Sequence, residues 1–175
     1  DLLDQSKTRP IRVALTPSLA TNWLMPRIGA FWDMYPDIEL ELLPAGKLVD
    51  LRRDNIDVAL RYGKGGWTGA KVTKLMAAGH VAVAAPNYLK DRTVDCLSDL
   101  KGTRWLMGRS QTEERFWLAA NNIDLELENV TVFQTDQLSR EAARAGLGIS
   151  VIPAPIAEPH IATGTFIALC YEENS

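Results

Sequence analysis

The start of the chain alternates between short apolar segments and helical segments, and this order restricts what it can fold into. Residues 11–15, 38–43 and 57–61 are short, apolar and partly β-branched, which indicates strands. An apolar stripe from Leu19 to Tyr35 has helical spacing, with an interruption expected at Pro26, and residues 48–53 favour a short helix. This order is typical of a parallel sheet with right-handed crossovers. The sequence therefore predicts an α/β unit.

A second α/β series follows the glycine-rich residues 62–67. Its pattern predicts strands at 72–75, 81–85, 103–107, 130–133, 149–152 and 166–169, and helices at 86–89, 113–121, 136–145 and 153–160. We therefore expect two α/β lobes. Such lobes should leave a ligand cleft between them, close to the carboxyl ends of strands.

Charge and composition exclude several classes of protein. The 175 residues carry 19 Lys and Arg against 22 Asp and Glu, a net charge of −3, which does not suit nucleic-acid binding by this chain itself. No apolar run approaches the roughly 20 residues that span a bilayer, and residues 1–5 do not resemble a signal peptide. Cys96 and Cys170 lie far apart and form neither a disulfide framework nor a metal motif, which favours the cytoplasm.

The residue patterns of common enzymes and metal sites are absent from the sequence. No dinucleotide-binding, phosphate-loop, zinc-protease or nucleophile-elbow motif occurs, and His80 and His160 each stand alone. Glu113 and Glu114 are adjacent, so they do not face one another on a helix and are interpreted as a solvated helix start. The sequence predicts no enzyme, no metal site and no cofactor.

Polar side chains precede three of the expected helices, where they suit either of two roles. They are Thr16 and Ser18, Ser110 and Thr112, and Thr135 and Asp136. Each could cap its helix through a side-chain oxygen. Together, hydroxyls and free N–H groups at helix starts also suit a carboxylate or another small anion. The sequence leaves both roles open.

Five segments of the chain form a recognisable set, namely residues 16–28 (TPSLATNWLMPRI), 35–40 (YPDIEL), 57–67 (DVALRYGKGGW), 133–136 (FQTD) and 142–153 (AARAGLGISVIP). These segments resemble the effector-binding domain of LysR-type transcriptional regulators, in the branch that contains the glycine-cleavage activator and the β-lactamase regulator. The resemblance covers residues 11–169 and implies a two-lobe, periplasmic-binding-protein-like (type 2) fold with crossover strands. Together with the strand and helix pattern, it predicts that the chain crosses between the lobes at residues 77–85 and again at 157–164. It also implies that a small effector in the cleft adjusts how a dimer or tetramer bends promoter DNA. The family contacts DNA through an N-terminal winged helix-turn-helix, which nothing in this chain resembles.

The resemblance also implies an effector site. Its expected residues are Thr16, Pro17, Ser18, Leu19, Ala45, Gly46, Arg61, Tyr62, Met107, Ser110, Thr135 and Asp136, and Asp50 matches a position tied to inducer response. Ser18 and Thr135 are expected to face each other across the cleft. Arg61 suits either a carboxylate of the effector or a structural role. An amino acid or a small carboxylate is the favoured effector, and a cell-wall peptide is also compatible.

The resemblance divides the chain into three parts. Residues 1–80 are expected in the first lobe and residues 81–160 in the second. Residues 161–175 are expected to return to the first lobe, whose C-terminal part is expected to be truncated. A homodimer is expected through the helix that carries Trp23, Ile28, Phe31 and Trp32. Two alternatives remain open. A solute-binding protein of a transporter shares the fold, and an enzyme on the same scaffold would need a catalytic constellation that the sequence does not show.

Overall fold

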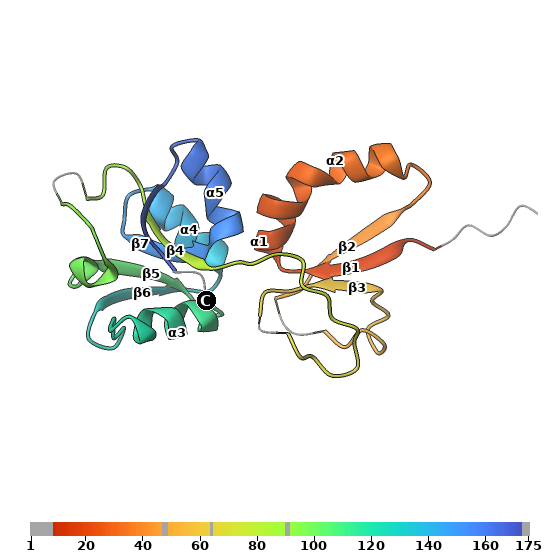
Figure 1. The fold of residues 1–175 in the computed structure, drawn as a ribbon, viewed down its shortest axis with the longest axis horizontal. Helices are drawn as coiled ribbons and strands as arrows, with labels where there is room; N and C mark the ends of the chain where they lie inside the picture. The colour runs from red at the N-terminus through yellow and green to blue at the C-terminus, as the bar shows by residue number, and fades with distance from the viewer. Residues whose placement is uncertain (1–8, 47–48, 64, 90–91, 173–175) are drawn as a thin grey trace, which may run out of the picture. The chain divides into compact units, whose positions relative to one another are not determined.

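The computed structural model describes residues 9–46, 49–63, 65–89 and 92–172, and the chain divides into two compact units, Asp1–Thr73 and Lys74–Ser175. The first unit contains β1 (Ile11–Leu15), α1 (Pro17–Leu19), the π-helical turn η1 (Ala20–Leu24), α2 (Met25–Met34), β2 (Leu40–Pro44) and β3 (Val58–Leu60). The second contains β4 (His80–Ala84), η2 (Leu97–Leu100), β5 (Arg104–Gly108), α3 (Thr112–Ala120), β6 (Asn129–Phe133), α4 (Asp136–Arg144), β7 (Ile149–Pro153), α5 (Ala154–Ala162) and β8 (Ile167–Tyr171) (Figure 1). Among the described helices, none has the length and apolar character needed to cross a membrane.

The first unit is built on a three-stranded parallel sheet in the order β2-β1-β3. Leu15 at the end of β1 is level with Pro44 of β2 and with Leu60 of β3. The parallel sheet predicted from the strand and helix order is confirmed. Because all three strands run the same way, the loops that follow them leave from one edge of the sheet.

Residues Pro17–Met34 are helical throughout, but the hydrogen-bond pattern changes just before Pro26. The Met25 N–H donates to the carbonyl of Ala20, five residues earlier, which makes a π-helical turn. Proline has no N–H, and its ring crowds the carbonyl of the preceding turn. The interruption expected at Pro26 is therefore this wider turn, after which α2 continues with Ile28 as its buried residue.

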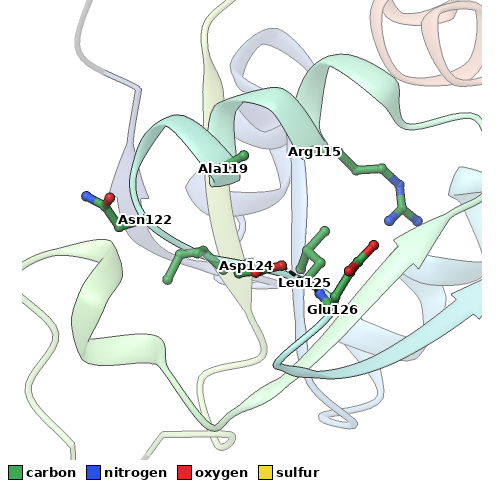
Figure 2. Close-up of a pocket in the computed structure, with 7 residues that line it drawn as sticks. Arg115, Ala119, Asn122, Asp124, Leu125 and Glu126 are labelled. Carbon is green, nitrogen blue, oxygen red and sulfur yellow. Dashed lines mark hydrogen bonds between the residues drawn. The ribbon is translucent and has the colours of Figure 1, made fainter.

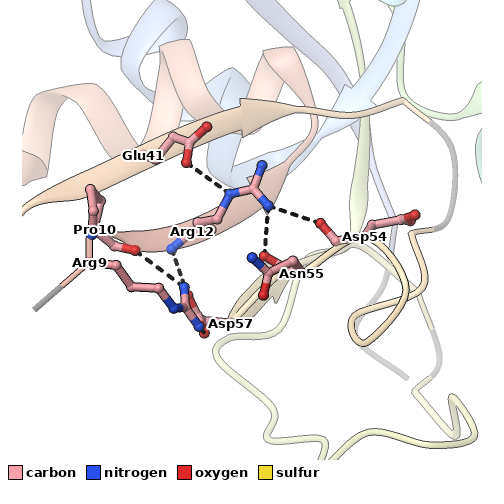
Figure 3. Close-up of polar contacts among 7 residues, drawn as sticks. All are labelled: Arg9, Pro10, Arg12, Glu41, Asp54, Asn55 and Asp57. Carbon is pink, nitrogen blue, oxygen red and sulfur yellow. Dashed lines mark hydrogen bonds and ion pairs between the residues drawn. The ribbon is translucent and has the colours of Figure 1, made fainter.

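A network of charged side chains joins the amino ends of the first-unit strands (Figure 3). Asp57 accepts two hydrogen bonds from the Arg9 guanidinium, at 2.7 and 2.8 Å, and one from the Arg12 backbone N–H. The Arg12 side chain contacts Glu41 of β2 at 2.8 Å and donates to the carbonyls of Asp54 and Asn55. The bonds from Arg9 and Arg12 lower the pKa of Asp57 to about 2. The backbone N–H, the Nε and the Nη1 of Arg12 thus hold neighbouring chain segments together.

The second unit has a five-stranded mixed sheet in the order β6-β5-β7-β4-β8. β5 runs parallel to β6 and β7, whereas β4 runs antiparallel to β7 and β8. Alternate residues of β4 enter two cores, because successive strand side chains point to opposite faces. Ala82 and Ala84 pack with η2 and α3, and Val81 and Val83 pack with α4 and α5. Helices therefore cover both faces of this sheet (Figure 1).

The described structure differs from the sequence prediction in several short segments. Residues 72–75 form no strand, and residues 86–89 form a turn instead of a helix. The helix expected at 48–53 is a turn at residues 51–55, while residue 48 lies outside the described residues. These segments are too short for periodicity to distinguish a helix or a strand from a turn.

The end of the chain also differs from the expected division into residues 1–80, 81–160 and 161–175. The described residues that follow α5 stay in the second unit, where β8 pairs with β4, and the first unit ends at Thr73. The physical reason is that β4 is fully apolar after His80 and has two edges to pair. β7 occupies one edge, and β8 occupies the other.

Candidate functional site

The edge of the first-unit sheet where its strands end carries most of the first-lobe residues implied by the resemblance. Thr16 follows β1, Ala45 follows β2 and Arg61 follows β3. The Ala45 N–H donates to the Leu15 carbonyl at 2.8 Å, which extends the pairing of the two strands to this edge. Thr16, Ala45 and Arg61 therefore leave neighbouring strands at one edge, where open α/β sheets generally bind ligands.

The helix that begins at Pro17 is capped by Thr16. The Thr16 Oγ1 accepts a hydrogen bond from the Leu19 N–H at 3.3 Å, and the Thr16 carbonyl accepts one from Ala20. Ser18 is half-buried, and its hydroxyl makes no hydrogen bond within the described ranges. Pro17 is exposed and Leu19 is half-buried. The capping role that the sequence left open at this helix belongs to Thr16.

Replacing Thr16 with alanine is expected to lower the free energy of unfolding by about 1 kcal/mol, because the Leu19 N–H loses its acceptor. The Ser18→Ala variant should change it by less than about 0.5 kcal/mol, since no hydrogen bond is lost. Urea unfolding followed by circular dichroism measures both values. Equal losses in the two variants would contradict this assignment of the cap.

Arg61 is the positively charged residue at the end of β3, and its guanidinium is only partly hydrogen-bonded. Its Nη1 donates to the Gly46 carbonyl at 3.4 Å, a long contact. Its Nε and Nη2 are buried and have no hydrogen-bond partner among the described residues. Burial lowers the pKa of Arg61 from its ordinary value. The neighbouring Tyr62 is exposed.

The second unit has its own edge at which parallel strands end, formed by β5 and β6. Gly108 and Phe133 are level at this edge, and the Arg109 N–H donates to the Phe133 carbonyl at 2.9 Å. The Ser110 Oγ donates to the Asp136 carboxylate at 2.9 Å. Thr135 caps α4 by accepting from the Leu138 N–H at 3.3 Å.

Gly108 permits the close approach of β5 to the start of α4. A Cβ at this position would lie 2.9 Å from the Asp136 Cα, closer than such atoms pack. The absence of a side chain therefore lets Ser110 and Asp136 meet.

Two buried polar residues at this second-unit edge were not predicted as part of the site. The Gln111 side chain accepts from the Gly108 N–H and donates to the Val151 carbonyl, both at 2.6 Å, and so links β5 to β7. Glu114 is only 9% exposed, and burial, reinforced by the nearby charge of Asp136, raises its pKa to about 7. The interpretation of Glu114 as part of a solvated helix start is wrong. Its position three residues before Trp117 and four before Leu118 places it on the apolar face of α3.

Other predicted residues have structural positions. Met107 is fully buried in the core that β5 forms with η2 and α3, so its side chain cannot line a ligand site in this conformation, contrary to the expectation. The Asp50 carboxylate accepts from the N–H groups of Arg52 and Arg53 and closes a local turn. The His80 Nδ1 lies 2.7 Å from the Glu172 carboxylate, and the His160 ring packs edge-on against Phe166.

A hollow of about 580 Å³ lies in the second unit beside α3 and the turn that follows it (Figure 2). It is lined by Arg115, Ala119, Asn122, Ile123, Asp124, Leu125 and Glu126, none of which is in the predicted site. Figure 2 shows the side chains of Arg115 and Glu126 pointing toward each other on one side of it. In the described part of the chain, no three His, Cys, Asp or Glu residues are arranged to hold a metal ion, and Cys96 and Cys170 are free thiols.

Comparison with known proteins gives consistent matches. The family model of the LysR substrate binding domain matches residues 4–174. The AhcY transcriptional activator HvrB of Rhodobacter capsulatus is 33% identical over 141 residues, 81% of this chain and 48% of that protein. The glycine cleavage system transcriptional activator of Escherichia coli K12 is 28% identical over 161 residues, 90% of this chain and 52% of that protein. The chain thus spans about half the length of the curated relatives that it matches.

Solved structures agree with these matches. The effector domain of the transcriptional regulator AmpR of Pseudomonas aeruginosa superposes with a TM-score of 0.76 at 25% identity, covering 91% of this chain and 78% of that one. The regulatory domain of CrgA from Neisseria meningitidis has a TM-score of 0.75 at 23% identity, with 91% and 79% coverage, and supports the fold.

The curated relatives are transcriptional activators and not enzymes, and the alternative of a transporter's solute-binding protein is not favoured. The type 2 periplasmic-binding-protein-like fold class expected from the resemblance is confirmed. The expected ligand cleft stays a prediction. The chain belongs to the LysR substrate-binding domain family, in the branch related to the glycine-cleavage and β-lactamase activators.

Proposed function

We propose that the chain is the effector-sensing part of a LysR-type DNA-binding transcriptional regulator, and that its effector is an amino acid or a small carboxylate. The observation that carries this proposal is the cation at the end of β3. Arg61 lies at an edge where three parallel strands end, beside the loops that carry Thr16 and Gly46. Such edges bind ligands in open α/β sheets, and a guanidinium there favours an anion.

DNA binding and self-association of the whole regulator are part of the same proposal. The net charge of −3 gives this chain no general attraction for DNA, so promoter contact is assigned to a separate N-terminal domain. On α2, the large apolar side chains of Met25, Trp32 and Met34 are more than 40% exposed. An exposed apolar helix face of this kind supports a homodimer.

A screen for thermal stabilisation tests the proposed function. We expect at least one amino acid or small carboxylate to raise the melting temperature of the chain in a saturable way. A ligand at 100 times its Kd adds about 2.7 kcal/mol to the stability of the folded state. The same compound should change the affinity of the full-length regulator for its promoter. A library in which no compound stabilises the chain, or a binder that leaves promoter affinity unchanged, would contradict the proposal.

A further inference from the structure

We propose that Arg61 is the carboxylate anchor of this domain, and that its Nε and Nη2 groups together grip the two oxygens of one carboxylate. This inference rests on the proposed function, because it names the chemical group by which the effector is recognised. It does not depend on which acid the effector is.

The two unpartnered nitrogens of Arg61 are the ones that a carboxylate needs. Nε and Nη2 lie on the same side of the planar guanidinium, and their N–H groups point in parallel, as the two oxygens of a carboxylate require. Both nitrogens are buried and have no hydrogen-bond partner in the described ranges. The third nitrogen, Nη1, donates to the Gly46 carbonyl at 3.4 Å. This contact orients the guanidinium and leaves the side that carries Nε and Nη2 without a partner in the described residues.

The charge of Arg61 also has no counter-ion among the residues that the structure describes. No salt bridge to Arg61 is found among the described residues, whereas Arg9, Arg12, Arg53 and Arg144 each pair with a carboxylate. Burial is the cause that lowers the pKa of Arg61. Arg61 is half-buried, and its Nε and Nη2 are the buried donors without a partner. Such donors on a charged group are unfavourable, so an anion that reaches them recovers lost electrostatic stabilisation.

Arg12 shows what an arginine with a purely structural role looks like in the same unit. Its Nε contacts Glu41, and its Nη1 donates to the carbonyls of Asp54 and Asn55, so its guanidinium is tied to the surrounding chain (Figure 3). Arg12 lies on β1, and its contacts are at the amino ends of the strands, whereas Arg61 follows the carboxyl end of β3. The contrast indicates that Arg61 is held ready for a partner from outside the unit.

Access to the anchor requires a local rearrangement. Water does not reach Nε or Nη2 in this conformation. A carboxylate therefore contacts them only in a conformation that exposes these two nitrogens, so that binding selects that conformation. A sensing domain needs such a link between its ligand and its conformation.

The test uses the 175-residue chain and pairs of small molecules in which a carboxylate is compared with its uncharged primary amide. Glycine, succinate, propionate and benzoate are each titrated to 50 mM beside the corresponding primary amide. Nuclear magnetic resonance follows the arginine Nε–Hε signals, and the signal missing from the Arg61→Lys variant identifies Arg61. At least one acid should shift this signal in a saturable way, and its amide should not.

The variants define the size of the effect. Arg61→Gln removes the charge and the paired donors, so affinity for the acid should fall about ten- to a hundredfold. Arg61→Lys keeps the charge but cannot form the paired contact, and it should lose about tenfold. Arg53→Gln removes an exposed arginine that pairs with Asp54 and serves as the matched control, with affinity expected within twofold of the wild type.

The outcomes separate the anchor from the proposed function. An acid that binds the Arg61→Gln variant as tightly as the wild type would overturn the anchor and leave the sensing function intact. The same conclusion follows if no acid shifts the Arg61 signal while an uncharged compound from the stabilisation screen does bind. If no compound of any class binds, the proposed function fails together with the anchor. If Arg61→Gln does not fold, the acid and the amide are compared on the wild type and on Arg61→Lys. The anchor is then overturned if the acid binds Arg61→Lys as tightly as the wild type.

Discussion

Replacing Trp105 with alanine should lower the free energy of unfolding of the second unit by about 3 kcal/mol, at the low end of the range of about 3–5 kcal/mol for buried tryptophan. Trp105 is fully buried in β5, level with Val130 of β6 and Ile149 of β7. Its loss removes apolar contacts and leaves a cavity between the sheet and α3. The low end is expected because the indole Nε1 has no hydrogen-bond partner in the described residues, so no favourable bond is lost.

Urea unfolding followed by far-ultraviolet circular dichroism measures this loss without relying on tryptophan fluorescence. Trp32→Ala is the matched control, since this side chain is 49% exposed on α2 and should cost less than about 1 kcal/mol. The Trp105→Phe variant should be much less damaging than Trp105→Ala, because it keeps a ring in the core and removes the unsatisfied N–H. A loss below about 1 kcal/mol for Trp105→Ala would contradict the packing described for this core.

The Glu114→Gln variant should be more stable than the wild type at pH 8, by on the order of 3 kcal/mol, and nearly equal to it at pH 4. Burial raises the pKa of Glu114 from 4.5 in its ordinary state to about 7 in the folded chain. Below 4.5, both the folded and the unfolded chain hold the proton, and the carboxyl costs nothing. Between pH 4.5 and about pH 7, the unfolded chain loses the proton of Glu114 before the folded chain does, so the stability of the wild type falls as the pH rises. Above 7 the folded chain carries the full cost of a buried carboxylate.

Unfolding curves at pH 4, 6 and 8 test this dependence directly. The slope of stability against pH should be smaller in Glu114→Gln than in the wild type. Glu113→Gln changes the adjacent, half-buried residue, and this variant should keep the slope of the wild type. A Glu114→Gln variant that keeps the wild-type slope would show that another group titrates in this range.

The elements that the sequence predicted correctly are those whose signals are local. The helix expected at 136–145 is α4, which has a threonine cap before it and is followed by Gly146 with a positive φ of 76°. The pairing of β8 with β4 could not be predicted in this way, because no local pattern distinguishes one apolar strand's partner from another's. β8 pairs with β4 because β4 has a free edge next to it in the folded sheet, and this edge exists only after the sheet has formed.

The site shows the same limit. The sequence identified the polar groups before the helices, and the structure shows that Thr16 and Thr135 act as caps. It placed Met107 in the site, because a family position does not report which face of a strand a side chain occupies. It also missed Gln111, whose two hydrogen bonds join segments that are far apart in the chain. Whether the nitrogens of a guanidinium find hydrogen-bond partners also depends on segments far apart in the chain, and at Arg61 two of them find none among the described residues.

The place of β4 in its sheet has a consequence for how the chain is made. β4 ends at Ala84, but its neighbours β7 and β8 begin only at Ile149 and Ile167. At roughly 5–20 residues per second, a ribosome takes several seconds to deliver them. During that time a strand with four successive apolar residues has no partner, so nascent chains are open to association through it. We therefore expect the yield of native protein to fall when synthesis is slowed between these strands.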